Sequence, residues 1–345
     1  MLNLLVSTLF GSLGPGEGPW RTEPAESHGL NATLLADAVA TVGRLVPERY
    51  CVLIVKDGVI VHETTIANST NTTYESDSLA KTATSLVIGA AVQAGLIDLD
   101  TPLAAYGVPP TCDSGPPDCW RAHCPPGVPC PHGPLGFFRN QTARTLLSQA
   151  SGCVTGQGCF APPGSAFTYD SEQYIQHLAH LLGVRAAHKG GEERTALAWA
   201  SRLMATLGLR DFYADDGLGN EFSAGGGQYI NCRGAARLAQ LVLNRGLWPS
   251  TTGGAPIQLV GEAYIEQMLS PQFESRGYSY GLLAWLNAKR SEHPLSPPCC
   301  APRWGPPSTC SGETLRSSLL GDDIADVAPP DVAIAMGWLG QCTRS

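Results

Sequence analysis

Ser78 and Lys81 are the two residues of this chain whose types and spacing most directly suggest chemistry. Residues three apart on a helix share a face, so the Lys81 amine would lie beside the Ser78 hydroxyl. A lysine buried there would lose solvation, its pKa would fall, and the neutral amine could take the serine proton. The alternative is an exposed serine and a solvated lysine at an ordinary helix start. The pair predicts a nucleophile and its base only when other parts of the chain support it.

The segment that must hold this pair is residues 77–95, DSLAKTATSLVIGAAVQAG. It carries no formal charge after Lys81, and its many small residues suit a helix that is packed on every side. Gly95 is a typical helix stop. The beginning of such a helix also places backbone N–H groups near Ser78. The sequence therefore predicts a buried helix with Ser78 at its mouth.

Four further stretches follow the helix in a fixed order. They are TARTLLSQASG at 142–152, PPGSAFTYDS at 162–171, FSAGGGQYINCRGAARLAQLVLNRG at 222–246 and YSYGL at 278–282. Together with the Ser-x-x-Lys pair they resemble the motifs of the serine β-lactamase-like family, which includes class C β-lactamases and penicillin-binding esterases. The resemblance runs from Cys51 to Gln341, and its order is more specific than any single match.

The resemblance implies an α/β (α+β) fold, in which an antiparallel sheet flanked by helices is interrupted by a helical domain and the active site lies between the two. Residue patterns agree with this architecture. Residues 51–63 are two β-branched runs joined at Asp57-Gly58, a strong hairpin signal. We also predict helices over 172–182, 192–207, 235–243 and 261–269, and strands over 278–286 and 332–336.

These elements give an expected division of the chain. Residues 1–28 would be leader or linker, 29–77 and 256–345 one discontinuous α/β sheet domain, and 78–255 a mainly helical domain with a Cys/Pro-rich loop at 105–135. The sequence stops at Ser345, where members of the family continue into another strand and a closing helix. With that C-terminal strand and helix missing, a sheet edge would be left uncovered.

Tyr169 is the third residue for which the resemblance implies a role in catalysis. In the family, the tyrosine of this motif sits against the nucleophile and the lysine and passes a proton to the leaving group. A nearby lysine cation would favour the phenolate. The alternative is a buried tyrosine that bonds a backbone carbonyl. Asp170-Ser171 replaces the usual Ser-Asn after the tyrosine, which weakens the case for β-lactam turnover.

The last family element corresponds here to residues 335–341, AMGWLGQ. Ala335 stands where the family carries lysine or histidine, so recognition of a substrate carboxylate is in doubt and an esterase or amidase is favoured. The resemblance implies a substrate strand that includes Gly337, Trp338 and Gly340. On this alignment the backbone N–H groups of Ser78 and Trp338 would form an oxyanion hole.

Length and charge restrict the partners of this chain. Its 345 residues can bury a large core. A net charge of −8 with only 22 basic residues gives no electrostatic footprint for nucleic acid or an anionic membrane. The longest apolar run, 85–97, is too short to span a bilayer. We expect no nucleic acid, no membrane span and no cofactor or metal, and a small-molecule or peptide-like ester or amide substrate; the oligomeric state stays open.

Cysteines and glycosylation sequons together indicate an oxidising compartment. The chain has twelve cysteines, and acceptor sequons begin at Asn31, Asn68, Asn71 and Asn140. A disulfide-stapled surface loop is expected around Cys112, Cys119, Cys124 and Cys130. Zinc is the rival reading, because His123 and His132 lie beside two of these cysteines, but the spacing is not Cys-x-x-Cys. Cys153 and Cys159 would staple a short loop, while a second Pro-rich insertion contains Cys299, Cys300 and Cys310.

Residues 1–10 are apolar but lack a basic start and a clear cleavage site, so the signal peptide is unclear. We nevertheless expect a secreted protein or one in the lumen of the secretory pathway. His177 and His180 are expected to share one face of a helix rather than bind metal.

Two functions from different classes fit these observations. The first is a metal-free serine hydrolase in which Ser78 attacks an ester or amide, Lys81 and Tyr169 move the protons, and water releases the acyl group. The second is a catalytically silent β-lactamase-like module that serves in binding or structure. Within the enzyme hypothesis, a D-alanyl peptidase or a β-lactamase is the minor branch.

Overall fold

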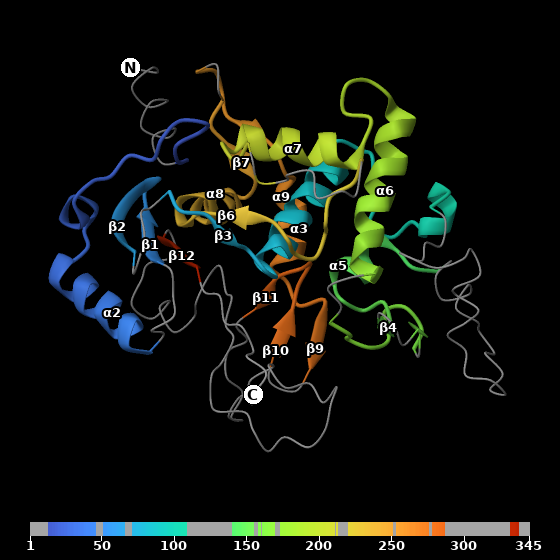
Figure 1. The fold of residues 1–345 in the computed structure, drawn as a ribbon, viewed down its shortest axis with the longest axis horizontal. Helices are drawn as coiled ribbons and strands as arrows, with labels where there is room; N and C mark the ends of the chain where they lie inside the picture. Colours follow the sequence, from blue (N-terminus) through green and yellow to red (C-terminus); the bar gives the residue numbers. More distant parts are fainter. Residues whose placement is uncertain are drawn as a thin grey trace.

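The structure of the chain is a computed structural model with helices and small antiparallel sheets (Figure 1). It describes residues 13–45, 51–65, 71–108, 140–154, 158–159, 161–169, 173–210, 212, 220–250, 253–275, 278–286 and 332–337. The helices are η1 (Ala25–His28), α2 (Ala32–Leu45), α3 (Leu79–Gln93), η2 (Leu103–Tyr106), α5 (Ala143–Leu147), α6 (Gln173–Lys189), α7 (Ala196–Thr206), α8 (Cys232–Leu243) and α9 (Glu262–Met268). The strands are β1 (Cys51–Lys56), β2 (Val59–Thr65), β3 (Tyr74–Glu75), β4 (Cys153–Val154), β5 (Gly158–Cys159), β6 (Tyr229–Ile230), β7 (Leu247–Trp248), β8 (Ile257–Gln258), β9 (Phe273–Ser275), β10 (Tyr278–Tyr280), β11 (Trp285–Leu286) and β12 (Val332–Gly337).

The predicted hairpin at residues 51–63 is confirmed and forms two strands of a three-stranded sheet. Its strands β1 and β2 meet at Asp57 and Gly58, both of which have positive φ, as the favoured two-residue hairpin turn requires. Strand β12 pairs antiparallel with the other side of β1, with Leu53 opposite Ala335 and Cys51 opposite Gly337. Segments from opposite ends of the sequence therefore form one sheet, in the order β12-β1-β2.

Helices cover both faces of this sheet, which explains why every residue of β1 is buried (Figure 1). On one face, Val52 and Ile54 contact a small core completed by Val39 of α2. On the other face, Leu53 and Val55 belong to the main core of the molecule, and α8 lies against β1 and β12. Alternation along the strand places successive side chains on opposite faces, so β1 links the two cores.

Helix α3 is the centre of the main core, as the absence of formal charge after Lys81 predicts. Its residues from Ala80 to Ala91 are all buried. At its end the chain turns through Gly95, which has a φ of 70°, and the Leu96 N–H donates to the Ala91 carbonyl at 2.9 Å. The helix that begins at Ser78 is therefore packed on all sides, and this packing fixes the position of Ser78.

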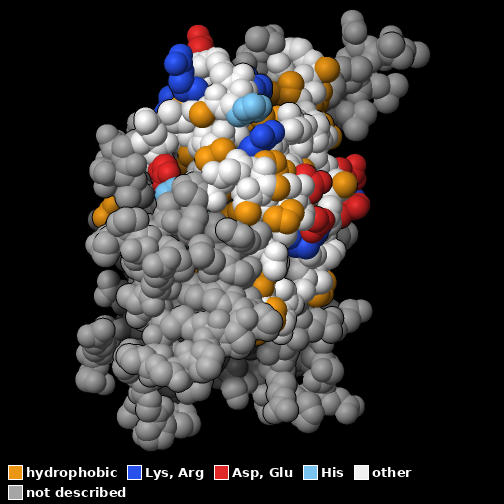
Figure 2. Space-filling model, turned by 90° about the vertical axis from the view of Figure 1, so that its right-hand side faces the viewer, with side chains coloured by type: hydrophobic (Ala, Val, Ile, Leu, Met, Phe, Trp, Pro, Cys, Tyr) orange, Lys and Arg blue, Asp and Glu red, His pale blue; other side chains and the backbone are white. Residues whose placement is uncertain are grey.

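Charged and apolar side chains are mixed on one face of the molecule. On the face shown in Figure 2, basic, acidic and apolar side chains are interspersed over the described residues. None of the described helices has both the length and the apolar character that a membrane span needs.

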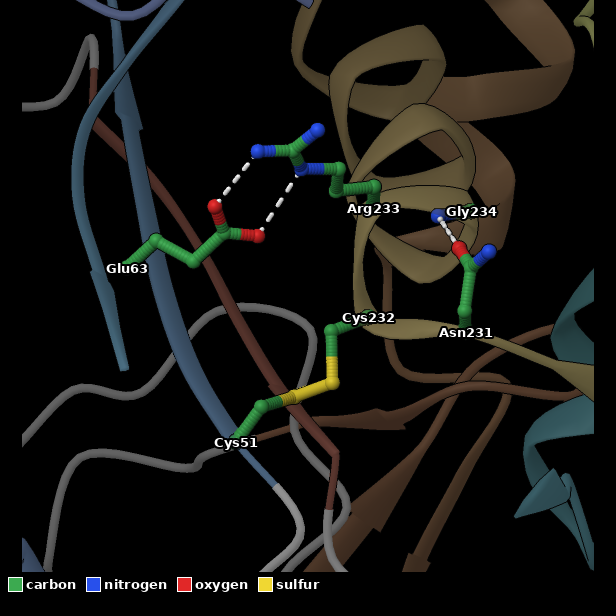
Figure 3. The surroundings of a disulfide bond; sticks show 6 residues. All are labelled: Cys51, Glu63, Asn231, Cys232, Arg233 and Gly234. Carbon is green, nitrogen blue, oxygen red and sulfur yellow. Dashed lines mark hydrogen bonds and ion pairs between the residues drawn. A yellow bond between two sulfur atoms is a disulfide. The ribbon is translucent and has the colours of Figure 1, made fainter. Parts of the chain in front are cut away.

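A disulfide joins the sheet to the helix that covers it. Cys51 at the start of β1 is bonded to Cys232 at the start of α8, 181 positions later in the sequence (Figure 3). Beside it, Arg233 makes a two-point ion pair with Glu63 of β2, with N···O distances of 2.9 and 2.7 Å. Asn231 caps α8 by accepting the Gly234 N–H. The sequence patterns did not give this cysteine pairing.

The predicted helix boundaries need small corrections, and one predicted strand is wrong. The helix expected at 192–207 begins at 196 because the Thr195 side chain caps it by accepting the Ala198 N–H. The helix expected at 172–182 runs to Lys189. Residues 278–286 form two strands, because Leu283 adopts a φ of 54° and the Gly281 N–H donates to the Ala284 carbonyl across the turn. The division into domains stays a prediction.

Candidate active site

Ser78 begins α3 in a conformation that leaves its hydroxyl available for chemistry. A serine at this position usually caps the helix with its side chain, but Ser78 has helical φ and ψ of −73° and −4° and makes no such bond. The preceding residue, Asp77, has a positive φ of 43°, a costly conformation for a residue other than glycine. The turn into the helix therefore presents the Ser78 hydroxyl instead of using it in the cap.

Lys81 lies beside Ser78, as the i, i+3 spacing predicts. Its Nζ atom is 3.0 Å from the Ser78 Oγ atom and donates to the Gly225 carbonyl oxygen at 2.8 Å. The Lys81 residue is only 1% exposed. The alternative of a solvated lysine is therefore excluded, and burial disfavours the charged form of an amine.

The segment at 222–228 supplies the carbonyl that Lys81 contacts. Ser76, two residues before Ser78, donates its backbone N–H to the Gln228 carbonyl at 2.7 Å. The Gln228 side chain in turn donates to the Ser223 carbonyl. Residues 222–228 are therefore hydrogen-bonded to the turn that leads into α3. Sequence reasoning matched the glycine triplet 225–227 to a family turn but did not identify Gly225 as a partner of Lys81.

Tyr169 joins the site from the loop before α6. The Lys81 Nζ atom lies 4.9 Å from the centroid of its ring, close enough for a cation–π interaction in the charged state of the amine. The Tyr169 residue is 37% exposed. The predicted trio of Ser78, Lys81 and Tyr169 therefore meets in space, and Lys81 contacts both of the other residues.

An aromatic cluster fixes the plane of Tyr169. Its ring stacks on Trp285 with centroids 5.6 Å apart and meets Tyr280 edge to face at 6.3 Å. Phe167 contacts the same two side chains from the other end of the loop. Burial raises the pKa of Tyr280, and electrostatic interaction with Tyr169 raises it further. Tyr280 is therefore a neutral wall of the site.

The loop that carries Tyr169 is anchored by backbone contacts to the preceding motif. The Thr168 N–H donates to the Gln149 carbonyl at 2.6 Å, and the Ala161 N–H donates to the Gly152 carbonyl at 3.2 Å. Gly152 has a φ of 70°, and a Cβ there would lie 2.1 Å from the Ala161 oxygen. Only glycine permits this approach, which explains the glycine that ends the 142–152 motif.

Asp77 adds a carboxyl group next to the nucleophile. Desolvation raises its pKa above the usual value, and the charge of Lys81 opposes that shift. Asp77 therefore interacts electrostatically with the same amine that contacts Ser78.

The remaining predicted site residues are only partly described. Gly337 ends β12 opposite Cys51, whereas Trp338, Gly340, Asp170 and Ser171 lie outside the described residues. The oxyanion hole therefore stays a prediction. Asn31, Asn71 and Asn140 are exposed, and Asn68 is outside the described part.

Only some of the cysteines that the sequence analysis singled out lie among the described residues. Cys153 is disulfide-bonded and lies opposite Cys159 in the β4–β5 ladder. The loop cysteines Cys112, Cys119, Cys124 and Cys130, and also Cys299, Cys300 and Cys310, lie outside the described residues. In the described part of the chain, no three His, Cys, Asp or Glu side chains form a group that could hold a metal ion.

Comparison with known proteins identifies the fold. The putative beta-lactamase from Bacteroides dorei DSM 17855 has a TM-score of 0.51 and 17% identity, covering 74% of this chain and 79% of that chain. The penicillin binding protein from Bacillus halodurans has a TM-score of 0.50 and 16% identity, covering 73% and 83%. The chain therefore has a β-lactamase/transpeptidase-like fold.

The sequence of this chain also matches a protein-family model over part of its length. Residues 50–216 match the family model described as Beta-lactamase. The octameric penicillin-binding protein homologue from Pyrococcus abyssi, with 16% identity and a TM-score of 0.49, covers 73% of this chain, and this chain spans 64% of that protein. No curated protein matches the sequence.

Proposed function

We propose that this protein is a serine hydrolase that cleaves an ester or amide through an acyl-enzyme on Ser78. The observation that carries the proposal is the 3.0 Å contact between the Ser78 hydroxyl and the buried Lys81 amine. A serine hydroxyl is a weak nucleophile until an adjacent base takes its proton. Lys81 is the base that lies within reach.

In the acylation step, Ser78 Oγ attacks the substrate carbonyl carbon while its proton passes to the neutral Lys81 amine. The carbonyl π bond becomes an oxyanion, which backbone N–H groups at the start of α3 and at residue 338 would stabilise. The oxyanion then collapses, the bond to the leaving group breaks, and the alcohol or amine leaves with a proton delivered through Tyr169. The proximity of Tyr169 to Lys81 supports this relay.

In the deacylation step, water attacks the acyl-enzyme and gives up a proton to the same base. The carboxylic acid departs, and the Ser78 hydroxyl is restored. Both steps use one pair of side chains in opposite directions, so no cofactor is required.

Two sequence features support an ester or amide without a recognition carboxylate as the substrate. Ala335 supplies no cation where the family carries lysine or histidine, and Asp170-Ser171 lacks the asparagine amide. Asp77 adds a carboxyl group beside the nucleophile. A carboxylate on the substrate would meet a site that is less attractive to anions, so penicillin-type substrates are the less favoured branch.

We further propose that the protein works in the secretory pathway or outside the cell. The Cys51–Cys232 disulfide and the bonded state of Cys153 suit an oxidising compartment. The exposure of Asn31, Asn71 and Asn140 makes these sequons accessible for glycosylation.

Stopped-flow hydrolysis of a short-chain nitrophenyl ester tests the proposal. We expect a burst of nitrophenol at about one equivalent per protein, followed by slower turnover. Ser78→Ala should abolish both phases, while Ser270→Ala, a matched change at an exposed serine that bonds only its own helix, should keep them. A chromogenic cephalosporin run in parallel separates esterase from lactamase activity. If the folded wild type hydrolyses the ester no faster than Ser78→Ala, the proposal is contradicted and the catalytically silent module is favoured.

A further inference from the structure

Gln176 of α6 makes a two-point contact with the segment that carries the Gly225 carbonyl. Its Nε2 atom donates to the Phe222 carbonyl at 2.9 Å, and its Oε1 atom accepts the Ala224 N–H at 3.1 Å. The amide thus makes the same pair of hydrogen bonds to the backbone that a neighbouring β-strand would make. The segment at 222–224 is therefore fixed by one side chain.

Thr84 of α3 also holds this segment. Its hydroxyl is fully buried and donates to the Ala224 carbonyl at 2.9 Å. The N–H and the C=O of Ala224 are thus each bound by a side chain, one from α6 and one from α3. The next residue, Gly225, places its carbonyl 2.8 Å from Lys81 Nζ.

The Gly225 carbonyl matters because the base needs a defined orientation. A neutral amine has two N–H bonds and one lone pair, and only the lone pair can take the Ser78 proton. A carbonyl oxygen can only accept, so it binds one N–H of the Lys81 amine, an orientation in which the lone pair can face Ser78 Oγ. A displaced carbonyl would let the amine rotate and misalign the base.

From this arrangement we infer that Gln176 and Thr84 are positioning residues, which clamp Ala224 and thereby hold Lys81 in the orientation that activates Ser78. The inference rests on the proposed serine hydrolase function and adds two residues that hydrogen-bond the segment at 222–224. Both act through the Gly225 carbonyl.

The clamp has its own support within α6. Glu221, just before the clamped segment, bonds His180 and lies 3.3 Å from Gln176 Nε2. His180 and Gln176 are four residues apart and share a helix face. The carboxylate therefore orients the Gln176 amide group with its N–H side toward residue 222.

The test compares the rate at which a fluorophosphonate probe phosphonylates the full-length protein, measured by intact mass, with kcat and KM for the nitrophenyl ester. Gln176→Met and Thr84→Val keep side-chain size and remove the hydrogen bonds. We expect each to slow labelling and kcat roughly tenfold or more, with KM changed less than about twofold, because the base and not the substrate is displaced. Thr84→Ser, which keeps the hydroxyl, should recover most of the loss.

Gln267→Met is the matched control, because Gln267 is also half-buried but bonds Arg144 and its own helix. Labelling of Gln176→Met and Thr84→Val at the rate of this control would overturn the inference and leave the proposed function intact. Rates that fall in all three variants in step with their melting temperatures would overturn it as well, as a general effect of stability. If Gln176→Met does not fold, the comparison of Thr84→Val with Thr84→Ser tests the inference. A wild type that neither labels nor turns over ester would overturn both proposals.

Discussion

The Lys81 amine lies 3.0 Å from the Ser78 hydroxyl, yet its second contact, to the Gly225 carbonyl, comes from 144 positions further along the chain. The first contact is local and follows from helix geometry. The second depends on the tertiary fold. The activation that we propose for Ser78 therefore depends on both, and each can be tested separately.

Replacing Lys81 by methionine tests the base. Methionine fills nearly the same volume, so the buried site should stay packed, but it cannot accept a proton. We expect kcat/KM for the nitrophenyl ester to fall roughly 100- to 10,000-fold. Lys189→Met, at an exposed lysine that lies over Trp199, is the control. A similar rate for Lys81→Met and the wild type would exclude Lys81 as the base.

Tyr169→Phe tests the proton relay without disturbing the aromatic cluster. Phenylalanine keeps the stacking on Trp285 and removes only the hydroxyl. We expect kcat to fall roughly 10- to 1,000-fold while the melting temperature stays the same. Tyr229→Phe, at a tyrosine that is 58% exposed, should change neither quantity. If Tyr169→Phe lowers the melting temperature and leaves kcat unchanged, the tyrosine is structural.

The Cys51–Cys232 disulfide should contribute to stability through the long loop that it closes. Cross-linking residues 181 positions apart restricts the unfolded chain. Removing both cysteines by changing them to alanine should lower the free energy of unfolding by about 2–5 kcal/mol. Urea unfolding under non-reducing conditions measures this change.

Glu63→Gln provides the comparison for the disulfide variant, because it breaks only the neighbouring ion pair with Arg233. Its effect should be about 1 kcal/mol or less. Equal losses in the two variants would contradict the proposed role of the cross-link.

His28 should make stability depend on pH. It bonds Asp57 at 2.8 Å and Glu23 at 3.1 Å, and these carboxylates raise its pKa above the usual 6.5. The folded state therefore binds the proton more tightly than the unfolded state. The stabilisation is fully present below pH 6.5 and is lost as the pH rises through the folded-state pKa.

The measurement is the free energy of unfolding of the wild type and His28→Gln between pH 5.5 and 9. The difference between the two proteins should be largest at the acid end and shrink toward the alkaline end. A difference that grows with pH would show that the sign is wrong.

Local patterns were sufficient where a single segment decides its own structure. The Asp57-Gly58 turn, the stop at Gly95 and the placement of Lys81 beside Ser78 each depend on residues a few positions apart. The structure has all three as the sequence predicts. Tyr169 could be placed only through the ordered family motifs, since one tyrosine in a loop has no distinguishing pattern.

Features that depend on distant segments could not be predicted. The Cys51–Cys232 pairing joins two elements that are remote in sequence. In the sequence Gln176 is an ordinary polar helix residue, and only the fold brings the segment at 222–224 against it. The predicted single strand at 278–286 failed because Gly281 turns the chain, and Leu283 donates its backbone N–H to Leu147 instead of continuing a ladder. Tertiary contacts decided each case.

Phosphonylation of Ser78 is the most direct test of the central claim. The folded wild-type protein is treated with a fluorophosphonate at neutral pH, its intact mass is measured, and the modified peptide is mapped. The account predicts one added phosphonyl group per protein, with loss of fluoride, on the peptide that contains Ser78, and no addition in Ser78→Ala. A folded wild-type protein that stays unmodified, or that is modified on another residue, would contradict the assignment of Ser78 as an activated nucleophile.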